Sequence, residues 1–264
     1  MPISPSPSLH TLANGVRIVA LPTAALATST VAVFIRSGSA HEPKLINGIS
    51  HVVEHMLFKG TATRDARRIN VDAEKLGADV NAHTDRDHTA FYMRGLPEHS
   101  GEFAHMLADL VLQPSFPADE LERERQVLLQ ELAEDEDDPV SSAYKLFDSA
   151  CWGLHPAAMP VIGTRTRVER LTRDDLVQYV QRQYRGANVV VGFYGAEQAR
   201  FYEKAGDGAA IDYATAALQQ MYGGELVSRI RKEKSKVTRW GQNPWTLGSY
   251  SSARPGMSKM LEKL

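Results

Sequence analysis

The sequence predicts an α+β fold: a mostly antiparallel β-sheet with helices packed on one face, followed by an irregular tail. Segments of alternating or β-branched residues predict the strands of the sheet. Two pairs of these segments are joined by short polar turns, which predicts antiparallel pairing. The helical layer is predicted by stretches with apolar residues three and four apart, which are grouped together rather than alternating strictly with the strands. The 264 residues, 43% of them hydrophobic, suffice for a buried core.

The first hundred residues are expected to contain most of the strands. In residues 9–21, Asn14-Gly15 supplies the two positive-φ positions of a tight hairpin turn. The other elements expected here are a buried strand at 31–35, a helix at 48–58, a helix that closes over 71–76 at Gly77, and a hairpin of 78–84 with 89–96.

Between residues 100 and 195 the pattern is mainly helical. An amphipathic helix is expected at 101–112, and a long acidic helix at 118–136 is expected to end at Asp138-Pro139. Thr172, with Asp175 three residues later, resembles a capping signal for a helix that runs to Tyr184. The β-branched run at 187–194 predicts a central strand.

Composition limits the classes of partner. A formal net charge of −2 gives no overall field toward nucleic acid or an anionic membrane, so neither is predicted as a partner. The uncharged stretch 18–35 is interrupted by Pro22 and hydroxyl residues, which suits two strands better than a membrane span. Cys151 has no cysteine to pair with and is expected to be a small buried residue. No secretory signal is read at the N-terminus, and a cytoplasmic location is expected.

The strongest candidate for chemistry is the segment His51-Val-Val-Glu54-His55. On a helix at about 100° per residue, positions four apart lie about 40° apart, so both imidazoles can bind one ion beside Glu54. Zinc suits such a site, since an open fourth position would hold a water whose pKa falls to about 7, with Glu54 as the base. The pattern also arises by chance, and alone it leaves the metal and no-metal interpretations about equally open.

A third ligand must come from elsewhere in the chain. The long acidic helix offers Glu124 and Glu131, which are seven residues apart and so lie on one face. Val127 and Leu128 indicate that this face is partly buried, where a carboxylate is costly unless it binds a metal or a ligating histidine. The rest of the acidic run is more typical of a solvated helix face. Five histidines are interpreted as surface or structural residues: His83, His88, His99, His105 and His155.

Residues 10–194 resemble the N-terminal catalytic half of the pitrilysin/insulinase/mitochondrial processing peptidase family, the inverted zincins with the signature H-x-x-E-H. The resemblance is carried by His51-Val-Val-Glu-His-Met-Leu-Phe-Lys-Gly-Thr61 and by Glu131, which lies 76 residues beyond His55. Further segments follow in family order at 77–84, 89–92, 138–139 and 155–164.

This resemblance implies a zinc endopeptidase, or the zinc-bearing subunit of one. The implied zinc ligands are His51, His55 and Glu131. It implies that Glu54 is the general base and that Glu124 orients a ligating histidine. Asn81 and Ala82 correspond to the family's edge strand, where a peptide substrate would bind extended, by strand addition. The family works as two homologous halves, so a second half or a partner subunit is expected.

Residues 1–195 are expected to form the peptidase domain, and residues 196–264 an atypical tail. Basic residues outnumber acidic ones in 225–264, and residues 196–256 are similar to a late segment of flavin-dependent amine oxidases. The G-x-G-x-x-G turn that would cradle a dinucleotide is missing, so no flavin is predicted. The tail is interpreted as a fused fragment or a poorly ordered segment.

Three alternatives to a peptidase remain. One is a non-catalytic assembly or chaperone-like subunit, although such members commonly lose ligands that this chain keeps. Another is a fragment of an amine oxidase, against which the missing dinucleotide turn argues. The last is a nucleic-acid contact through the basic tail, which has the charge but no recognisable motif.

Overall fold

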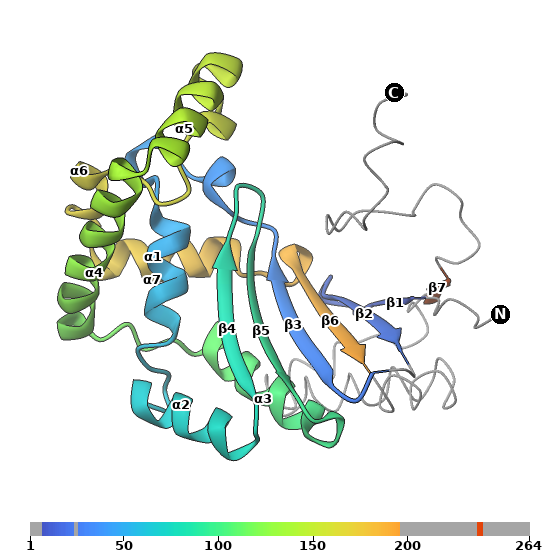
Figure 1. The fold of residues 1–264 in the computed structure, drawn as a ribbon. Coiled ribbons are helices and arrows are strands. Elements are labelled where there is room, and N and C mark those ends of the chain that lie inside the picture. The colour runs from blue at the N-terminus through green and yellow to red at the C-terminus, as the bar shows by residue number, and fades with distance from the viewer. Residues whose placement is uncertain (1–6, 24–25, 196–236, 240–264) are drawn as a thin grey trace.

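The structure is a computed structural model that describes residues 7–23, 26–195 and 237–239. Figure 1 shows one sheet with helices beside it and at one end. The strands are β1 (Ser8–Thr11), β2 (Arg17–Pro22), β3 (Ser29–Ile35), β4 (Asp79–Thr84), β5 (Thr89–Gly95), β6 (Val189–Gly195) and β7 (Val237–Arg239). The α-helices are α1 (Ile49–Leu57), α2 (Ala66–Lys75), α3 (Ser100–Leu112), α4 (Ala118–Asp137), α5 (Pro139–Trp152), α6 (Arg165–Val168) and α7 (Arg173–Gln183). Short 3₁₀ turns are η1 (Ser39–His41), η2 (Lys44–Ile46), η3 (Pro97–His99), η4 (Pro156–Ala158) and η5 (Gly186–Asn188).

The sheet is mostly antiparallel, as the sequence predicts. Its strand order is β4-β5-β3-β6-β2-β1-β7, and β2–β6 is the one parallel pair among the described strands. β6 lies between β3 and β2, which confirms the prediction of a central strand near the end of the domain. β4 lies at one edge, and this position matters for the site below.

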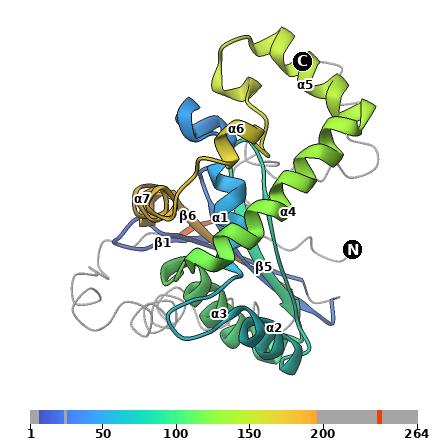
Figure 2. The same ribbon diagram turned by 90° about the vertical axis from the view of Figure 1, so that its left-hand side faces the viewer.

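One face of the sheet carries the core. Alternate residues of β3, namely Val31, Val33 and Ile35, are buried there together with Phe91 and Met93 of β5. Side chains from α1, α3, α4 and α7 belong to the same apolar cluster. Figure 2 shows α1 and α4 crossing in front of the strands and α3 below them. No helix in the described part of the chain has the length and apolar character needed to cross a membrane.

The first hairpin differs in detail from the predicted tight turn. Gly15 has a φ of 89°, but Asn14 has no positive φ, and the loop between β1 and β2 spans residues 12–16. Leu12 and Val16 are buried in a small apolar cluster of their own, so the longer loop places two extra side chains in the interior. Asn14 instead accepts a hydrogen bond from the backbone N–H of Val16 through its side chain.

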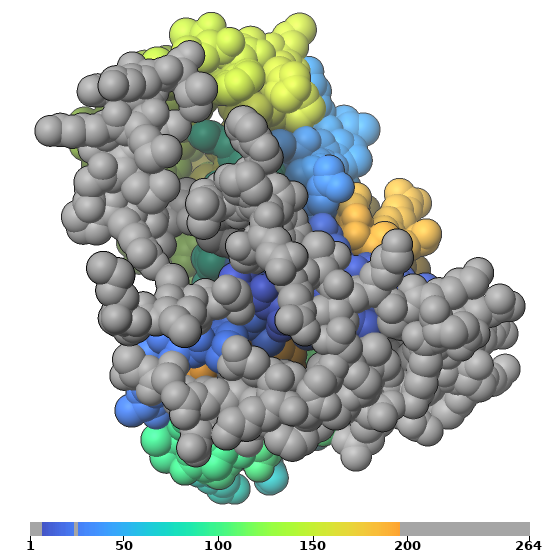
Figure 3. All heavy atoms as spheres, turned by 90° about the vertical axis from the view of Figure 1, so that its right-hand side faces the viewer, coloured from blue at the N-terminus to red at the C-terminus, as the bar shows by residue number. Residues whose placement is uncertain are grey.

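The sequence did not predict α5. Asp138-Pro139 ends α4 as expected, yet the same pair begins α5, because Asp138 accepts hydrogen bonds from the backbone N–H groups of Val140 and Ser141 and proline suits the first helical position. Cys151 lies on this helix and is exposed, so the expectation of a buried cysteine was wrong. In Figure 3, α5 stands at the upper end of the molecule and α3 at the opposite end.

The expected tail is described only at β7. Residues 237–239 pair antiparallel with β1 and extend the sheet by one short strand. The other predictions for the tail, including the amine-oxidase-like segment and its domain boundary, fall on residues 196–236 and 240–264, outside the described residues.

Candidate metal centre

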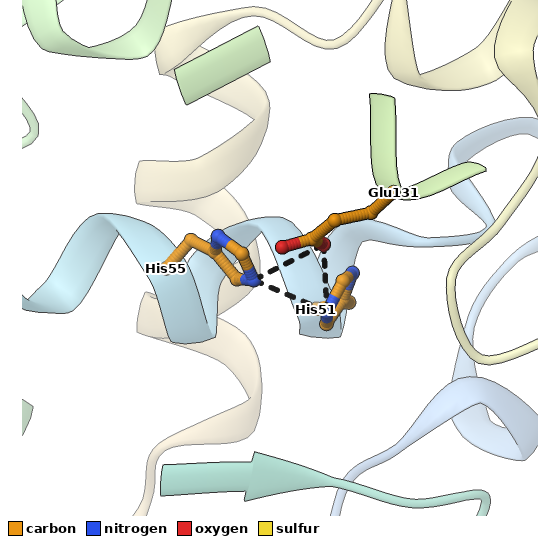
Figure 4. Close-up of side chains that lie close together, drawn as sticks. All are labelled: His51, His55 and Glu131. Atoms are coloured by element: carbon orange, nitrogen blue, oxygen red, sulfur yellow. Dashed lines mark hydrogen bonds and ion pairs between the residues drawn. The ribbon is translucent and has the colours of Figure 1, made fainter. Parts of the chain in front are cut away.

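Two imidazole rings of α1 face the same point. His51 and His55 are one turn apart, and their Nε2 atoms are 3.2 Å from each other. The ring planes are inclined at 72° with centroids 4.5 Å apart, so the rings meet edge to face. Figure 4 shows both Nε2 atoms directed toward the carboxylate of Glu131.

Glu131 completes the group from a different element. Its Oε2 lies 3.8 Å from Nε2 of His51 and 3.6 Å from Nε2 of His55. Two ligand atoms bound to zinc at about 2.0–2.2 Å in a tetrahedral arrangement lie roughly 3.3–3.5 Å apart. The three observed separations, 3.2, 3.6 and 3.8 Å, lie close to this range. The two nitrogens and one oxygen therefore fit a divalent ion such as zinc.

Glu124 lies behind His55. Its Oε1 is 2.9 Å from Nδ1 of His55, and its Oε2 is 2.6 Å from Nζ of Lys59. Glu124 is only 7% exposed, so the carboxylate is satisfied by the histidine and the lysine rather than by solvent. A carboxylate at Nδ1 favours the tautomer that leaves the Nε2 lone pair of His55 free to bind a metal. Lys59 lies in the turn directly after α1, outside the helical pattern, so the sequence offered no spacing signal for this contact.

Glu54 lies on the neighbouring flank of α1 and is partly buried. Its Oε2 is buried without a hydrogen-bond partner among the described residues. Burial raises the pKa of Glu54 above its ordinary value, and the charge of Glu131 adds to this, while Thr84 and His55 act in the opposite direction. The side chain therefore offers a free, poorly solvated oxygen close to the three clustered residues.

His51 is held in its neutral form. Burial lowers the pKa of His51 to about 4, and the neighbouring His55 contributes to the decrease. A neutral imidazole has a free lone pair, which is the form that binds a metal. Nδ1 of His51 is buried without a hydrogen-bond partner among the described residues, in contrast with Nδ1 of His55.

A second buried carboxylate fixes the start of α1. Glu42 is 4% exposed and accepts hydrogen bonds from the backbone N–H groups of Gly48 and Ser50 and from Nδ2 of Asn47, at 2.7–2.8 Å. These groups lie at the helix N-terminus, where a negative charge is favourable. Gly48 has a φ of 97°, and a Cβ there would lie 2.8 Å from Cα of Gly163, so both the turn and the close crossing require glycine.

The sequence did not indicate this role of Glu42. Glu42 lies in an irregular segment with no periodic pattern. Its hydrogen-bond donors, on Asn47, Gly48 and Ser50, are brought to its carboxylate only in the folded chain. Tyr179 of α7 adds a further contact, since its hydroxyl bonds Oγ of Ser50 at 2.7 Å and Oγ of Ser37 at 2.8 Å. Together these contacts position α1, and hence His51 and His55, against the rest of the domain.

The predicted peptide-binding residues lie on the edge strand β4. Asn81 is exposed and Ala82 is partly buried, and they pair with Tyr92 and Phe91 of β5. The side chain of Asn81 accepts a hydrogen bond from the backbone N–H of Ala82 at 2.8 Å. That N–H is therefore directed away from β5, toward the open edge of the sheet. The structure thus brings five predicted residues together around α1 and α4 and places these two on the adjacent edge strand.

Comparisons with known proteins agree with this architecture. The sequence model described as Insulinase (Peptidase family M16) matches residues 17–165. A second model, described as Flavin containing amine oxidoreductase, matches residues 117–262, which includes α4 and α5 as well as the tail. The amine-oxidase similarity noted in the tail is therefore present, and it begins within the helical part of the domain.

Individual relatives extend over most of the chain. "Uncharacterized zinc protease YmxG" of Bacillus subtilis is 36% identical over 186 residues, which are 70% of this chain and 46% of that protein. "Cytochrome b-c1 complex subunit 1, mitochondrial" of Bos taurus is 33% identical over 196 residues, 74% of this chain and 41% of that protein. The chain therefore spans less than half the length of these two relatives.

A solved structure shares the fold. "The crystal structure of a protease from Helicobacter pylori" superimposes with a TM-score of 0.73 at 22% identity, covering 83% of this chain and 50% of that chain. The M16 model covers residues 17–165, more than half of the chain, and includes His51, His55 and Glu131. The chain belongs to the insulinase family of peptidases, family M16.

Proposed function

We propose that this chain is the zinc-bearing, catalytic part of a metalloendopeptidase that hydrolyses peptide bonds. The convergence of Nε2 of His51, Nε2 of His55 and Oε2 of Glu131 within 4.8 Å of one another carries the proposal. Two imidazole nitrogens and one carboxylate oxygen are the donor set of a catalytic zinc site that keeps one position open. The family relationship and the zinc-protease name of the Bacillus relative support the same assignment.

In this proposal the residues around the site have distinct roles. A bound zinc would polarise the scissile carbonyl and make an attacking water more acidic. Glu54 accepts the proton of that water at its unpartnered Oε2 and later returns it to the leaving amine. Glu124 acts through His55, which it keeps in the required tautomer.

A peptide substrate would add to the sheet as a strand beside β4. This edge is adjacent to the metal centre, since Thr84 of β4 influences the pKa of Glu54. The backbone N–H of Ala82 points toward the open edge and is satisfied there by Asn81. A bound peptide carbonyl would replace the Asn81 side chain as acceptor, so Asn81 protects the edge when no substrate is present.

We also propose that a second half or partner subunit covers α5. The chain spans less than half of the relatives compared above, and one of these is named as a subunit of a complex. Val140, Tyr144 and Phe147 follow one another at helical spacing on α5, and each is more than 60% exposed. Sedimentation velocity of the chain mixed with a homologous second half tests this proposal. A complex that Phe147→Ser abolishes would identify the face as the interface, whereas equal complex formation by the wild type and Phe147→Ser would argue against it.

Zinc content and peptide hydrolysis together test the catalytic proposal. The purified full chain should contain about one tightly held zinc per molecule by elemental analysis after dialysis, and His51→Ala should lose it. The zinc-loaded protein should cleave an unstructured peptide library, followed by mass spectrometry. A folded chain without zinc would overturn the proposed metal centre.

A non-catalytic assembly subunit is the competing function. It predicts no hydrolysis by the zinc-loaded chain, alone or with a second half, and no difference in hydrolysis between the wild type and Glu54→Gln. The unpartnered, buried carboxylate oxygen of Glu54 supports the catalytic alternative, because such an oxygen is unfavourable for stability and a role in proton transfer would account for it.

A further inference from the structure

A second pair of facing histidines lies at the tip of the β4–β5 hairpin. His83 is the penultimate residue of β4, and His88 directly precedes β5. Their Nε2 atoms are 3.2 Å apart, the same separation as in the pair on α1. The two rings are almost perpendicular, at 89°, with centroids 5.2 Å apart. The two Nε2 atoms therefore face one another.

The environment of His88 sets the direction of its Nε2. Oδ1 of Asp87 lies 2.7 Å from Nδ1 of His88, so the proton on this ring is held at Nδ1 and the Nε2 lone pair remains available. The ring also lies near Phe34 of β3, at 6.0 Å between centroids. A carboxylate behind one histidine of a facing pair is the same arrangement that Glu124 makes behind His55.

The surroundings of His83 also restrict its ring and favour its neutral form. Its ring lies 6.3 Å from that of Tyr92 on β5, which limits its rotation. Partial burial and the nearby His88 lower the pKa of His83, which keeps the imidazole neutral at neutral pH. Asp85 and Asp87 each place a carboxylate oxygen within 4.8 Å of a ring nitrogen of His88. Oxygen donors are thus close to the His88 ring.

This group is separate from the metal centre on α1. Side chains alternate along β4, and Ala82 and Thr84 lie on the partly buried face that meets the helices. His83 lies on the opposite, exposed face of the strand. An ion bound at His83 would therefore be reached from solvent without passing the candidate catalytic site.

We propose that His83 and His88 bind a second divalent transition-metal ion, such as Zn²⁺ or Cu²⁺, through their Nε2 atoms. Water molecules would complete the coordination. Such an ion would join the end of β4 to the residue before β5, and so hold the hairpin tip in one conformation. Having two imidazole ligands, this site binds zinc more weakly than the three-residue centre on α1.

Zinc stoichiometry of the full chain tests the proposal without any activity assay. Equilibrium dialysis against Zn²⁺ followed by elemental analysis should give two ions per wild-type chain and one per His83→Ala or His88→Ala chain. His105→Ala is the matched control, because His105 is an exposed histidine on α3, and this variant should keep two ions. His51→Ala should keep one, and the double variant with His83→Ala should keep none.

The outcomes separate the two sites. If His83→Ala and His88→Ala are folded by circular dichroism and bind as much zinc as the wild type, the second site is overturned. Zinc lost in those variants but unchanged in His51→Ala would support the second site while overturning the proposed catalytic one. If His83→Ala fails to fold, electron paramagnetic resonance of Cu²⁺ bound to the His51→Ala variant tests the proposal instead. The spectrum should show coupling to two imidazole nitrogens, and the absence of this coupling would overturn the proposal.

Discussion

At the scale of single residues, Glu54 experiences opposing influences. Burial and Glu131 raise its pKa, whereas Thr84 and His55 lower it. Glu54 is adjacent in sequence to His55, yet it is not among the three residues whose ligand atoms cluster. The removal of its charge and the removal of a ligand should therefore have different consequences, and this difference can be measured.

Glu54→Gln should keep the metal and lose hydrolysis. The amide has nearly the shape of the carboxylate but cannot accept a proton, so peptide hydrolysis should fall by about 10²–10⁴-fold or more while zinc per chain stays unchanged. Elemental analysis and a peptide-cleavage rate measured on the same sample check this. Glu74→Gln, at an exposed position of α2, serves as the control and should change neither quantity. Loss of zinc from Glu54→Gln would contradict the role given to it.

Three glutamates of α4 should show graded effects on zinc affinity. Glu131→Gln removes a ligand atom and should weaken binding most, whereas Glu124→Gln disturbs only the partner of His55, which costs roughly 10–100-fold. Glu134 lies on the exposed face of α4, so Glu134→Gln should have little effect on zinc affinity. Competition with a chelator of known affinity measures all three dissociation constants. Equal values for Glu131→Gln and Glu134→Gln would show that the third ligand is wrongly placed.

At the scale of elements, periodicity accounts for what could be predicted. The helical spacing of apolar residues located α1, and the same spacing placed His51 and His55 on one face. The seven-residue spacing singled out Glu124 and Glu131 among the acidic residues of α4, but only the family resemblance assigned Glu131 as the ligand and Glu124 as its neighbour. α5 was missed because Asp138-Pro139 can both end and begin a helix, and Glu42 was missed because its partners come from a turn formed by the folded chain.

Glu42→Ala should destabilise the domain strongly. The substitution leaves three buried donors at the start of α1 without their acceptor, at about 1–3 kcal/mol each, so a loss of about 3 kcal/mol or more is expected. Urea unfolding in metal-free buffer, followed by circular dichroism, measures the change. Glu74→Ala removes an exposed carboxylate and should shift the unfolding free energy by no more than about 0.5 kcal/mol. Similar losses in both variants would mean that Glu42 does not fix the helix.

At the scale of the whole molecule, the metal centre joins two helices that share one core. His51 and His55 come from α1 and Glu131 comes from α4, and both helices contribute buried side chains to the central apolar cluster. A bound ion therefore connects elements that are far apart in sequence. Because the unfolded chain does not hold the three ligands together, metal affinity adds directly to the stability of the folded state.

Zinc should therefore raise the thermal midpoint of the full chain. At a free zinc concentration of about 100 times the dissociation constant, the added stability is about 2.7 kcal/mol, which corresponds to roughly 5–10 °C for a domain of this size. The free zinc concentration is kept below the dissociation constant of the weaker pair at His83 and His88, so that this pair stays largely empty. Scanning calorimetry with and without a chelator should show the increase in the wild type and in His105→Ala, and none in His51→Ala. An equal increase in His51→Ala would mean that the ion stabilising the fold is bound outside α1 and α4.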